Sequence, residues 1–117
     1  MNIFHIAEKV IWENALSEGI YYPEGFSKEG FIHCSELDQI LGAANTFYSS
    51  RKDIVLLEID AHLVGFPIKY ESAVGSGERF PHLYGPLMIY AVVHVYAFKP
   101  DNAGEFRLPE ELSGSGT

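Results

Sequence analysis

Four consecutive apolar residues, Ile54 to Leu57, limit the possible folds of this chain more than any other feature of its sequence. A continuous apolar run of this length is typical of a central strand that is covered on both faces. The sequence therefore predicts a sheet with this strand inside it and with other elements packed against it.

Two segments have the periodicity of amphipathic helices. In residues 8–19, apolar residues recur at i,i+4 spacing, and Gly19 suits the position after the helix end, where a left-handed conformation costs glycine little. In residues 35–50, Ser35 and Asp38 resemble a capping box at the start of a helix. We expect its apolar stripe to be buried against the sheet; the stripe consists of Leu37, Ile40, Leu41, Ala44, Phe47 and Tyr48.

Several other segments have the composition of strands; they are residues 2–7, 30–35, 66–72 and 90–98. The segments rich in proline or glycine are expected to be loops or irregular; they are residues 20–29, 73–80 and 81–89. The order is strand, helix, strand, helix and then strands. This order predicts an α+β fold, in which two main helices pack against a small mixed or antiparallel sheet.

Length and composition fit a single domain. We expect residues 1–99 to form it and residues 100–117 to be a polar C-terminal tail, of which SGSGT is frayed. The formal net charge is −8, from 16 acidic and 8 basic residues, which disfavours non-specific binding of nucleic acid. No apolar run has the length of a membrane helix, and the single Cys34 cannot form an internal disulfide. These features favour a cytoplasmic protein that does not bind a membrane.

Three histidines lie at positions of interest, namely His5 in the first strand, His33 near the end of the second and His82 in an irregular segment. A single histidine of this kind is most often a satisfied structural residue, whereas several that converge on one cleft would indicate a site. His33 and Cys34 are adjacent, so they point to opposite faces of a strand, and no zinc-binding spacing is present. No metal site is expected. An apolar, buried role is also favoured for Cys34 over a nucleophilic one.

The stretch FPHLYGPL, residues 80–87, has two prolines that restrict the backbone and one glycine that permits a tight bend. His82 and Tyr84 would share a face if the segment is extended. The segment is either a rigid loop that presents both side chains, partly exposed, at the cleft of His33, or a turn whose aromatic residues cover the core.

The chain resembles a small bacterial family known as domain of unknown function 952. The resemblance extends from Ile3 to about Phe98, and its two signatures are GFIHCS and FPHLYGPL. That family is grouped by distant similarity with the ADP-ribosyltransferase fold, so the resemblance implies this fold and a nucleotide-shaped cleft. His5 would take the place of the histidine that hydrogen-bonds an ADP-ribose hydroxyl in such folds, and we expect His5 and His33 on adjacent strands of one sheet with their side chains on the same face. The usual catalytic glutamate has no counterpart near the last motif, where His82 or Tyr84 stands nearest.

These implications predict a histidine-lined cleft that binds a nucleotide, ADP-ribose or a sugar-phosphate-like molecule, with NAD as the candidate cofactor. His33 and His82 are the candidate catalytic acid and base of a transferase or hydrolase that lacks the usual glutamate. The candidate ligand-binding residues are His5, Ser35, Arg79 and Tyr84. The alternative is a non-catalytic ligand-binding or interaction module whose histidines are structural.

Overall fold

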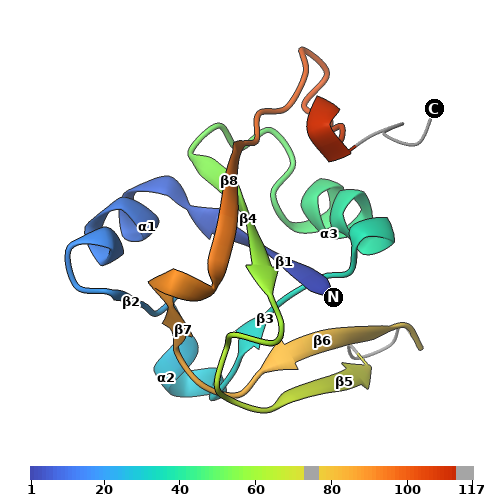
Figure 1. Ribbon diagram of the computed structural model, residues 1–117. Coiled ribbons are helices and arrows are strands. Elements are labelled where there is room, and N and C mark those ends of the chain that lie inside the picture. The colour runs from blue at the N-terminus through green and yellow to red at the C-terminus, as the bar shows by residue number, and fades with distance from the viewer. Residues whose placement is uncertain (73–76, 113–117) are drawn as a thin grey trace.

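The computed structural model describes residues 1–72 and 77–112, and its centre is a three-stranded antiparallel sheet. The strands are β1 (Asn2–Glu8), β4 (Ile54–Asp60) and β8 (Val92–Ala97), in the order β1-β4-β8 (Figure 1). The central position of β4 confirms the prediction made from its apolar run.

Each face of this sheet contacts a different cluster of core residues. Val55 and Leu57 of β4 point into a cluster that contains Trp12, whereas Leu56, between them, points into a cluster that contains Ile40. All four residues of the apolar run are therefore buried, because neighbouring side chains of a strand point to opposite faces.

The two main helices lie on opposite sides of this sheet (Figure 1). Helix α1 (Lys9–Leu16) follows β1 directly and contributes to the first cluster, and helix α3 (Ile40–Phe47) contributes to the second. A 3-10 turn, η1 (Leu37–Gln39), precedes α3. Its capping box is formed by Glu36 and Gln39 and not by Ser35 and Asp38, so the expected register was wrong by one residue.

The predicted apolar stripe of the second helix is buried only in part. Ile40 and Ala44 are completely buried, and Leu41 and Tyr48 pack against the cluster from partly exposed positions. Phe47 is 73% exposed, and Leu37 is also exposed. The helix therefore turns a narrower face to the sheet than the sequence pattern suggested.

A second antiparallel sheet lies below the first in Figure 1 and has the order β3-β6-β5. It consists of β3 (Ile32–His33), β6 (Arg79–Leu83) and β5 (Ile68–Ser72). An antiparallel bridge between Phe4 and Ser35 joins it to the first sheet, through two backbone hydrogen bonds of 2.8 and 2.7 Å. The chain thus folds as an α+β structure with antiparallel sheets and few helices, as predicted.

Two segments expected to be irregular contain regular structure. Residues 20–29 include strand β2 (Ile20–Tyr21) and the short helix α2 (Phe26–Glu29). The stretch 81–89 belongs in part to β6 and includes β7 (Leu87–Met88), which pairs with β2. Of the glycine-rich loop expected over residues 73–80, residues 73–76 lie outside the described residues.

Pro81 does not interrupt β6, and the reason is local. The Pro81 carbonyl accepts a 3.0 Å hydrogen bond from the backbone N–H of Cys34, directly after β3 ends. The N–H that proline lacks would point to the same side of the strand, where the ladder stops, so little pairing is lost.

Gly85 is required for packing, because a Cβ there would lie 2.3 Å from Cγ of the Phe66 ring.

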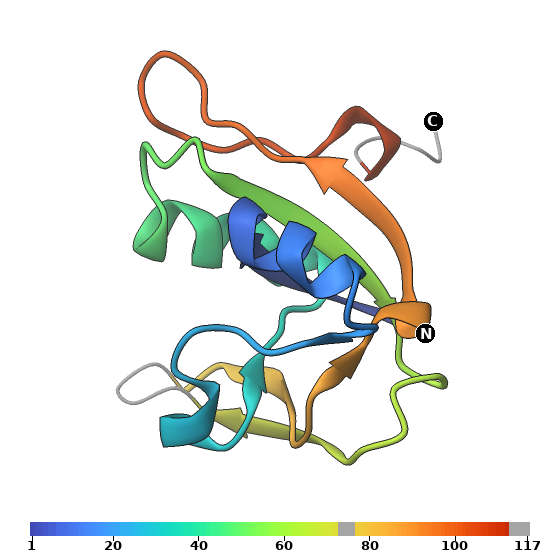
Figure 2. The ribbon, with the colours of Figure 1, turned by 90° about the vertical axis from the view of Figure 1, so that its left-hand side faces the viewer.

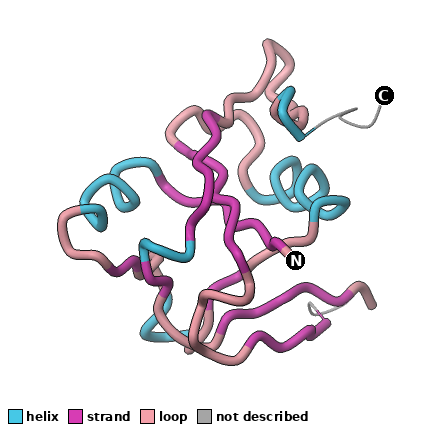
Figure 3. Tube along the Cα trace, in the orientation of Figure 1, coloured by secondary structure: helices cyan, strands magenta, loops and turns pink. Residues whose placement is uncertain are grey.

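The chain after β8 packs back onto the core beyond residue 99. The Phe106 side chain is 3% exposed and contacts Phe98 with ring centroids 4.7 Å apart. Two further 3-10 turns are η2 (Ile89–Ala91) and η3 (Glu110–Leu112). The segment expected to be a polar tail thus contains a core residue, and its expected frayed end, residues 113–117, lies outside the described part. Figures 2 and 3 show this segment beside the end of α3. None of the helices described has the length and apolarity needed to cross a membrane.

Candidate functional site

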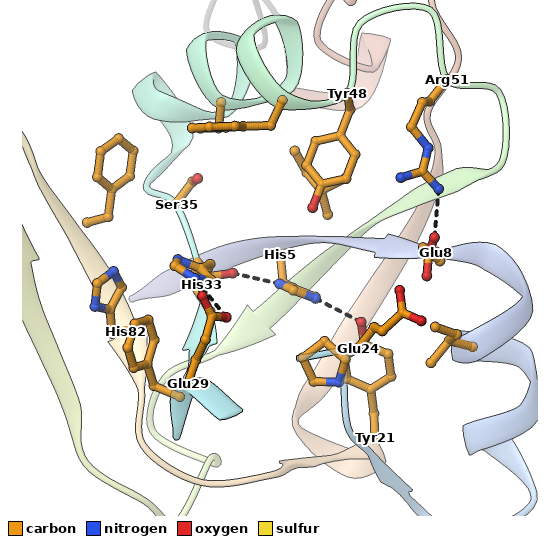
Figure 4. Close-up of a pocket in the computed structure, with 18 of the residues that line it drawn as sticks. His5, Glu8, Tyr21, Glu24, Glu29, His33, Ser35, Tyr48, Arg51 and His82 are labelled. Carbon is orange, nitrogen blue, oxygen red and sulfur yellow. Dashed lines mark hydrogen bonds and ion pairs between the residues drawn. The ribbon is translucent and has the colours of Figure 1, made fainter. Parts of the chain in front are cut away.

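A cavity of about 620 Å³ lies where β1, β3 and β6 meet α3 and the segment between β2 and α2 (Figure 4). Its volume is within the range of small-molecule sites. Its walls are largely apolar and aromatic, with Phe31, Phe47, Tyr48 and Phe80 among them. The titratable side chains that line it are His5, Glu8, Tyr21, Glu24, Glu29, His33, Cys34, Tyr48, Arg51 and His82.

His5 is buried at the base of this cavity and is fully hydrogen-bonded. Its Nδ1 lies 2.6 Å from the backbone oxygen of His33, and its Nε2 lies 2.8 Å from the hydroxyl of Tyr21. A carbonyl oxygen only accepts, so Nδ1 carries the proton and Nε2 accepts from Tyr21. Burial lowers the pKa of His5 to about 4, so the ring is neutral at pH 7. Both ring nitrogens are occupied, and His5 therefore positions β3 through the His33 carbonyl.

His33 is on the open side of the cavity, where its side chain is 60% exposed. Its Nε2 lies 3.1 Å from both carboxylate oxygens of Glu29, at the end of α2. The other ring nitrogen has no hydrogen bond to any residue that the structure describes. His33 is thus an accessible imidazole that is oriented by a carboxylate.

His82 is held more tightly than the sequence suggested. Its Nδ1 lies 2.8 Å from Glu71 Oε1, and the Tyr84 hydroxyl donates to the same oxygen at 2.6 Å. These bonds from Tyr84 and His82 lower the pKa of the Glu71 carboxyl. Phe31 stacks on His82 with centroids 4.1 Å apart, and His82 is 7% exposed. The expectation of a partly exposed His82 in a rigid loop was therefore wrong, because the segment is a strand covered by Phe31.

The register of β3 and β6 brings the two candidate catalytic histidines together. His33 pairs directly with His82, and their ring centroids are 5.2 Å apart. Both line the cavity. His5 and His33, in contrast, were expected on adjacent strands of one sheet, whereas they lie in different sheets joined by the bridge at Ser35. His5 and His33 still line the same cavity.

Two hydroxyl groups of the cavity have no partner among the described residues. Ser35 is 7% exposed, and its Oγ makes no hydrogen bond to residues 1–72 or 77–112. Tyr48 is half-buried, and no described residue hydrogen-bonds its hydroxyl; burial raises the pKa of this phenol. Figure 4 shows both hydroxyls turned toward the same open space. Neither oxygen is a fully buried atom without a partner, so both are open to the cavity and available to a ligand.

Arg51 is the one arginine or lysine among the residues that line the cavity. Its Nη2 donates to Glu8 at 2.7 Å and to Asp53 at 2.5 Å, and its Nε donates to Asp53 at 2.9 Å. Arg79, which was predicted to bind the ligand, is exposed and does not line the cavity. Tyr84 does not line it either and acts on His82 through Glu71.

Cys34 lines the cavity, but its thiol is unreactive. It is 3% exposed, and burial raises the pKa of its thiol to about 12, so it is protonated at pH 7. Within the described residues, no group of three or more His, Cys, Asp or Glu side chains is arranged to hold a metal ion.

The sequence did not single out Glu29, Tyr48, Arg51 or Glu71. Glu29 lies four residues before His33, but the contact joins the end of α2 to β3 and is not a helical pair, so the spacing gave no signal. Glu71 reaches His82 through the β5–β6 pairing. Lys69, two residues before Glu71 in β5, pairs with His82 of β6. That pairing has no signal in the sequence apart from the alternation of residues 66–72.

Solved structures share the fold of this chain. The chain is 30% identical to the protein CC0527 from Caulobacter crescentus, whose crystal structure superposes with a TM-score of 0.85 over 96% of this chain and 98% of that one. The solution NMR structure of the same protein gives a TM-score of 0.81 at the same identity, over 96% of this chain and 97% of that one. Among curated proteins, no sequence matches. A family described as "Protein of unknown function (DUF952)" matches residues 6–95, and the chain belongs to this family.

Proposed function

We propose that the cavity binds a nucleotide-like small molecule, such as a nucleotide, ADP-ribose or a sugar phosphate, and that His33 and His82 transfer protons in a transferase or hydrolase reaction on it. The observation that carries the proposal is the pair of imidazoles 5.2 Å apart at the cavity, each bonded to its own carboxylate. Two such groups can serve as acid and base on opposite sides of one reacting bond.

The hydrogen bonds support one direction for the proposed proton transfer. Glu71 accepts from Nδ1–H of His82, which leaves Nε2 of His82 with its lone pair as the base. His82 takes a proton from an attacking water or hydroxyl, and His33 in its protonated form returns one to the leaving oxygen or nitrogen. Glu29 accepts a hydrogen bond from Nε2 of His33 when that nitrogen carries a proton. A bell-shaped pH dependence of the rate is expected.

The carboxylates of the cavity are relevant to the usual catalytic glutamate, which has no counterpart near the last motif. Glu24 and Glu29 both line the cavity, and Glu29 contacts His33, so acidic groups are present in the cavity although the last motif provides none. We extend the proposal to an ADP-ribosyltransferase-like relationship of the fold, with NAD as the candidate cofactor. The support for it is the sequence resemblance together with a cavity bordered by histidine, serine and glutamate.

A second candidate is a non-catalytic binding module, and one observation favours it. Both nitrogens of His5 are used within the protein, and His82 is stacked and nearly buried, as is typical of structural histidines. Ligand binding without turnover would distinguish this module from an enzyme.

A thermal-shift screen with NAD, ADP-ribose, nucleosides, nucleotides and sugar phosphates tests the proposal. A ligand at about 100 times its Kd should add about 2.7 kcal/mol to the free energy of unfolding. The His33→Gln variant should retain the melting temperature of the parent and abolish turnover. His62→Gln, at an exposed turn outside the cavity, is the matched control and should change neither. If no compound shifts the melting temperature, or if His33→Gln turns over normally, the proposal is wrong.

A further inference from the structure

We infer that the cavity selects an uncharged, hydroxyl-bearing ring compound, such as a nucleoside, over the phosphorylated form of the same compound. This inference rests on the proposed function for the cavity and its two histidines, but it differs in the ligand: it replaces the phosphorylated compounds named above with uncharged ones, because it excludes phosphate groups from the cavity. It follows from the charges and the unpartnered polar atoms around the Ser35 and Tyr48 hydroxyls.

The charges of the cavity wall disfavour an anion. Glu8, Glu24 and Glu29 line the cavity, against the guanidinium of Arg51 and, in its protonated form, the ring of His33. Arg51 is already bonded to Glu8 and to Asp53, so two carboxylates neutralise it. Glu24 has no hydrogen bond or ion pair with any described residue. A phosphate placed here would face excess negative charge in a partly dry space, where Coulomb interactions are stronger than in water.

The unpartnered polar atoms instead match hydroxyl groups. The Ser35 side chain is more than nine-tenths buried, yet its hydroxyl has no partner among the residues described. The Tyr48 hydroxyl and the Glu24 carboxylate turn toward the same space from other elements (Figure 4). A carboxylate accepts from hydroxyls, and a serine or tyrosine hydroxyl both donates and accepts. A sugar hydroxyl is the ligand group that satisfies all three.

The apolar part of the wall accommodates a ring. Phe31, Phe47 and Phe80 line the cavity together with Tyr48. Aromatic walls with a few convergent polar groups are typical of sites for flat organic ligands. A base or similar ring would lie against these side chains while its sugar contacts Ser35 and Glu24.

Isothermal titration calorimetry at about 0.01 M ionic strength tests the inference, because charge effects are least screened there. The probes are adenosine, guanosine, cytidine and uridine, each compared with its 5′-monophosphate. At least one nucleoside should bind at least about tenfold more tightly than its monophosphate. Ser35→Ala should weaken that nucleoside about tenfold without lowering the melting temperature, since its hydroxyl has no partner in the protein.

A pair of variants isolates the charge effect. Glu24→Gln should reduce the preference for the nucleoside severalfold by improving the binding of the monophosphate. Glu13→Gln changes the net charge equally, but Glu13 is an exposed residue of α1 outside the cavity. The preference for the nucleoside should therefore not change. A monophosphate that binds as tightly as its nucleoside overturns the inference and leaves the proposed function standing. If neither class binds, the inference fails, and the proposed function fails too if NAD, ADP-ribose and sugar phosphates also leave the melting temperature unchanged.

Discussion

His33 and His82 face each other across the β3–β6 ladder, with ring centroids 5.2 Å apart and a separate carboxylate bonded to each ring. One of the two rings is open to solvent, and the other is covered by Phe31. The same pair therefore combines an accessible imidazole with a fixed one, and the two should respond differently to substitution.

Replacing His82 with alanine should lower the stability. The change removes a ring stacked on Phe31 and leaves Glu71 with only the Tyr84 hydroxyl, so we expect a loss of about 1–3 kcal/mol in the free energy of unfolding. Urea denaturation measures the loss. The control is His33→Ala, whose exposed ring should contribute less than about 1 kcal/mol. Equal losses for both variants would contradict the described burial.

The buried His5 should make the stability depend on pH. Its pKa is about 4 in the folded protein and about 6.5 when unfolded, so the unfolded chain binds the proton first as the pH falls. The contribution of neutral His5 to the free energy of unfolding is fully present above pH 6.5. It decreases toward pH 4, by up to about 3 kcal/mol.

NMR spectroscopy tests this prediction without a variant. The His5 ring protons should show no titration between pH 5 and 8, and the nitrogen shifts should report a proton on Nδ1. Titration of His5 near pH 6.5 would contradict its burial.

The effect of a substitution along α3 on stability should depend on whether the residue faces the core or the solvent. Ile40 is completely buried, and Ile40→Ala should cost about 2–5 kcal/mol in unfolding free energy. Phe47 is 73% exposed, and Phe47→Ser should change the stability by less than about 0.5 kcal/mol. Leu41, at an intermediate position, should fall between them. Chemical denaturation of the three variants checks the order, and a large loss for Phe47→Ser would disprove the orientation of the helix.

Two glycine substitutions should have opposite signs. Gly85→Ala brings a Cβ within 2.3 Å of the Phe66 ring and should cost about 1–3 kcal/mol in unfolding free energy. Gly42→Ala lies in α3 with no atom near the new methyl group, and it should stabilise the protein by about 0.5–1 kcal/mol. Differential scanning calorimetry compares the two. If Phe66→Ala does not reduce the cost of Gly85→Ala, this explanation of the glycine is wrong.

The elements that the sequence predicted well are those whose patterns are local. The apolar run of β4 and the i,i+4 spacing of α1 both depend on neighbouring residues, and both elements are where they were expected. Short strands such as β2 and β7 contain two residues each, too few for any periodicity, and they exist because they pair with each other. Pro81 led to the prediction of an irregular segment. The sequence does not show that β3 ends beside Pro81, where the missing N–H costs little pairing.

The same distinction applies to the candidate site. His33 and His82 could be selected by residue type, and their convergence follows from a strand register that the sequence does not encode locally. The role of Tyr84 was misread, because its partner Glu71 comes from a neighbouring strand. Arg51 replaces Arg79 as the arginine of the cavity, because the loop after α3 returns to Glu8 at the end of β1.

The most direct test of the cavity as a ligand site is chemical-shift mapping of the backbone amides during titration with nucleosides and with NAD. We expect saturable changes for at least one compound, concentrated at His33, Ser35 and Tyr48, with little change in β8 on the far edge of the central sheet. Changes confined to other surfaces, or none with any compound, would contradict it.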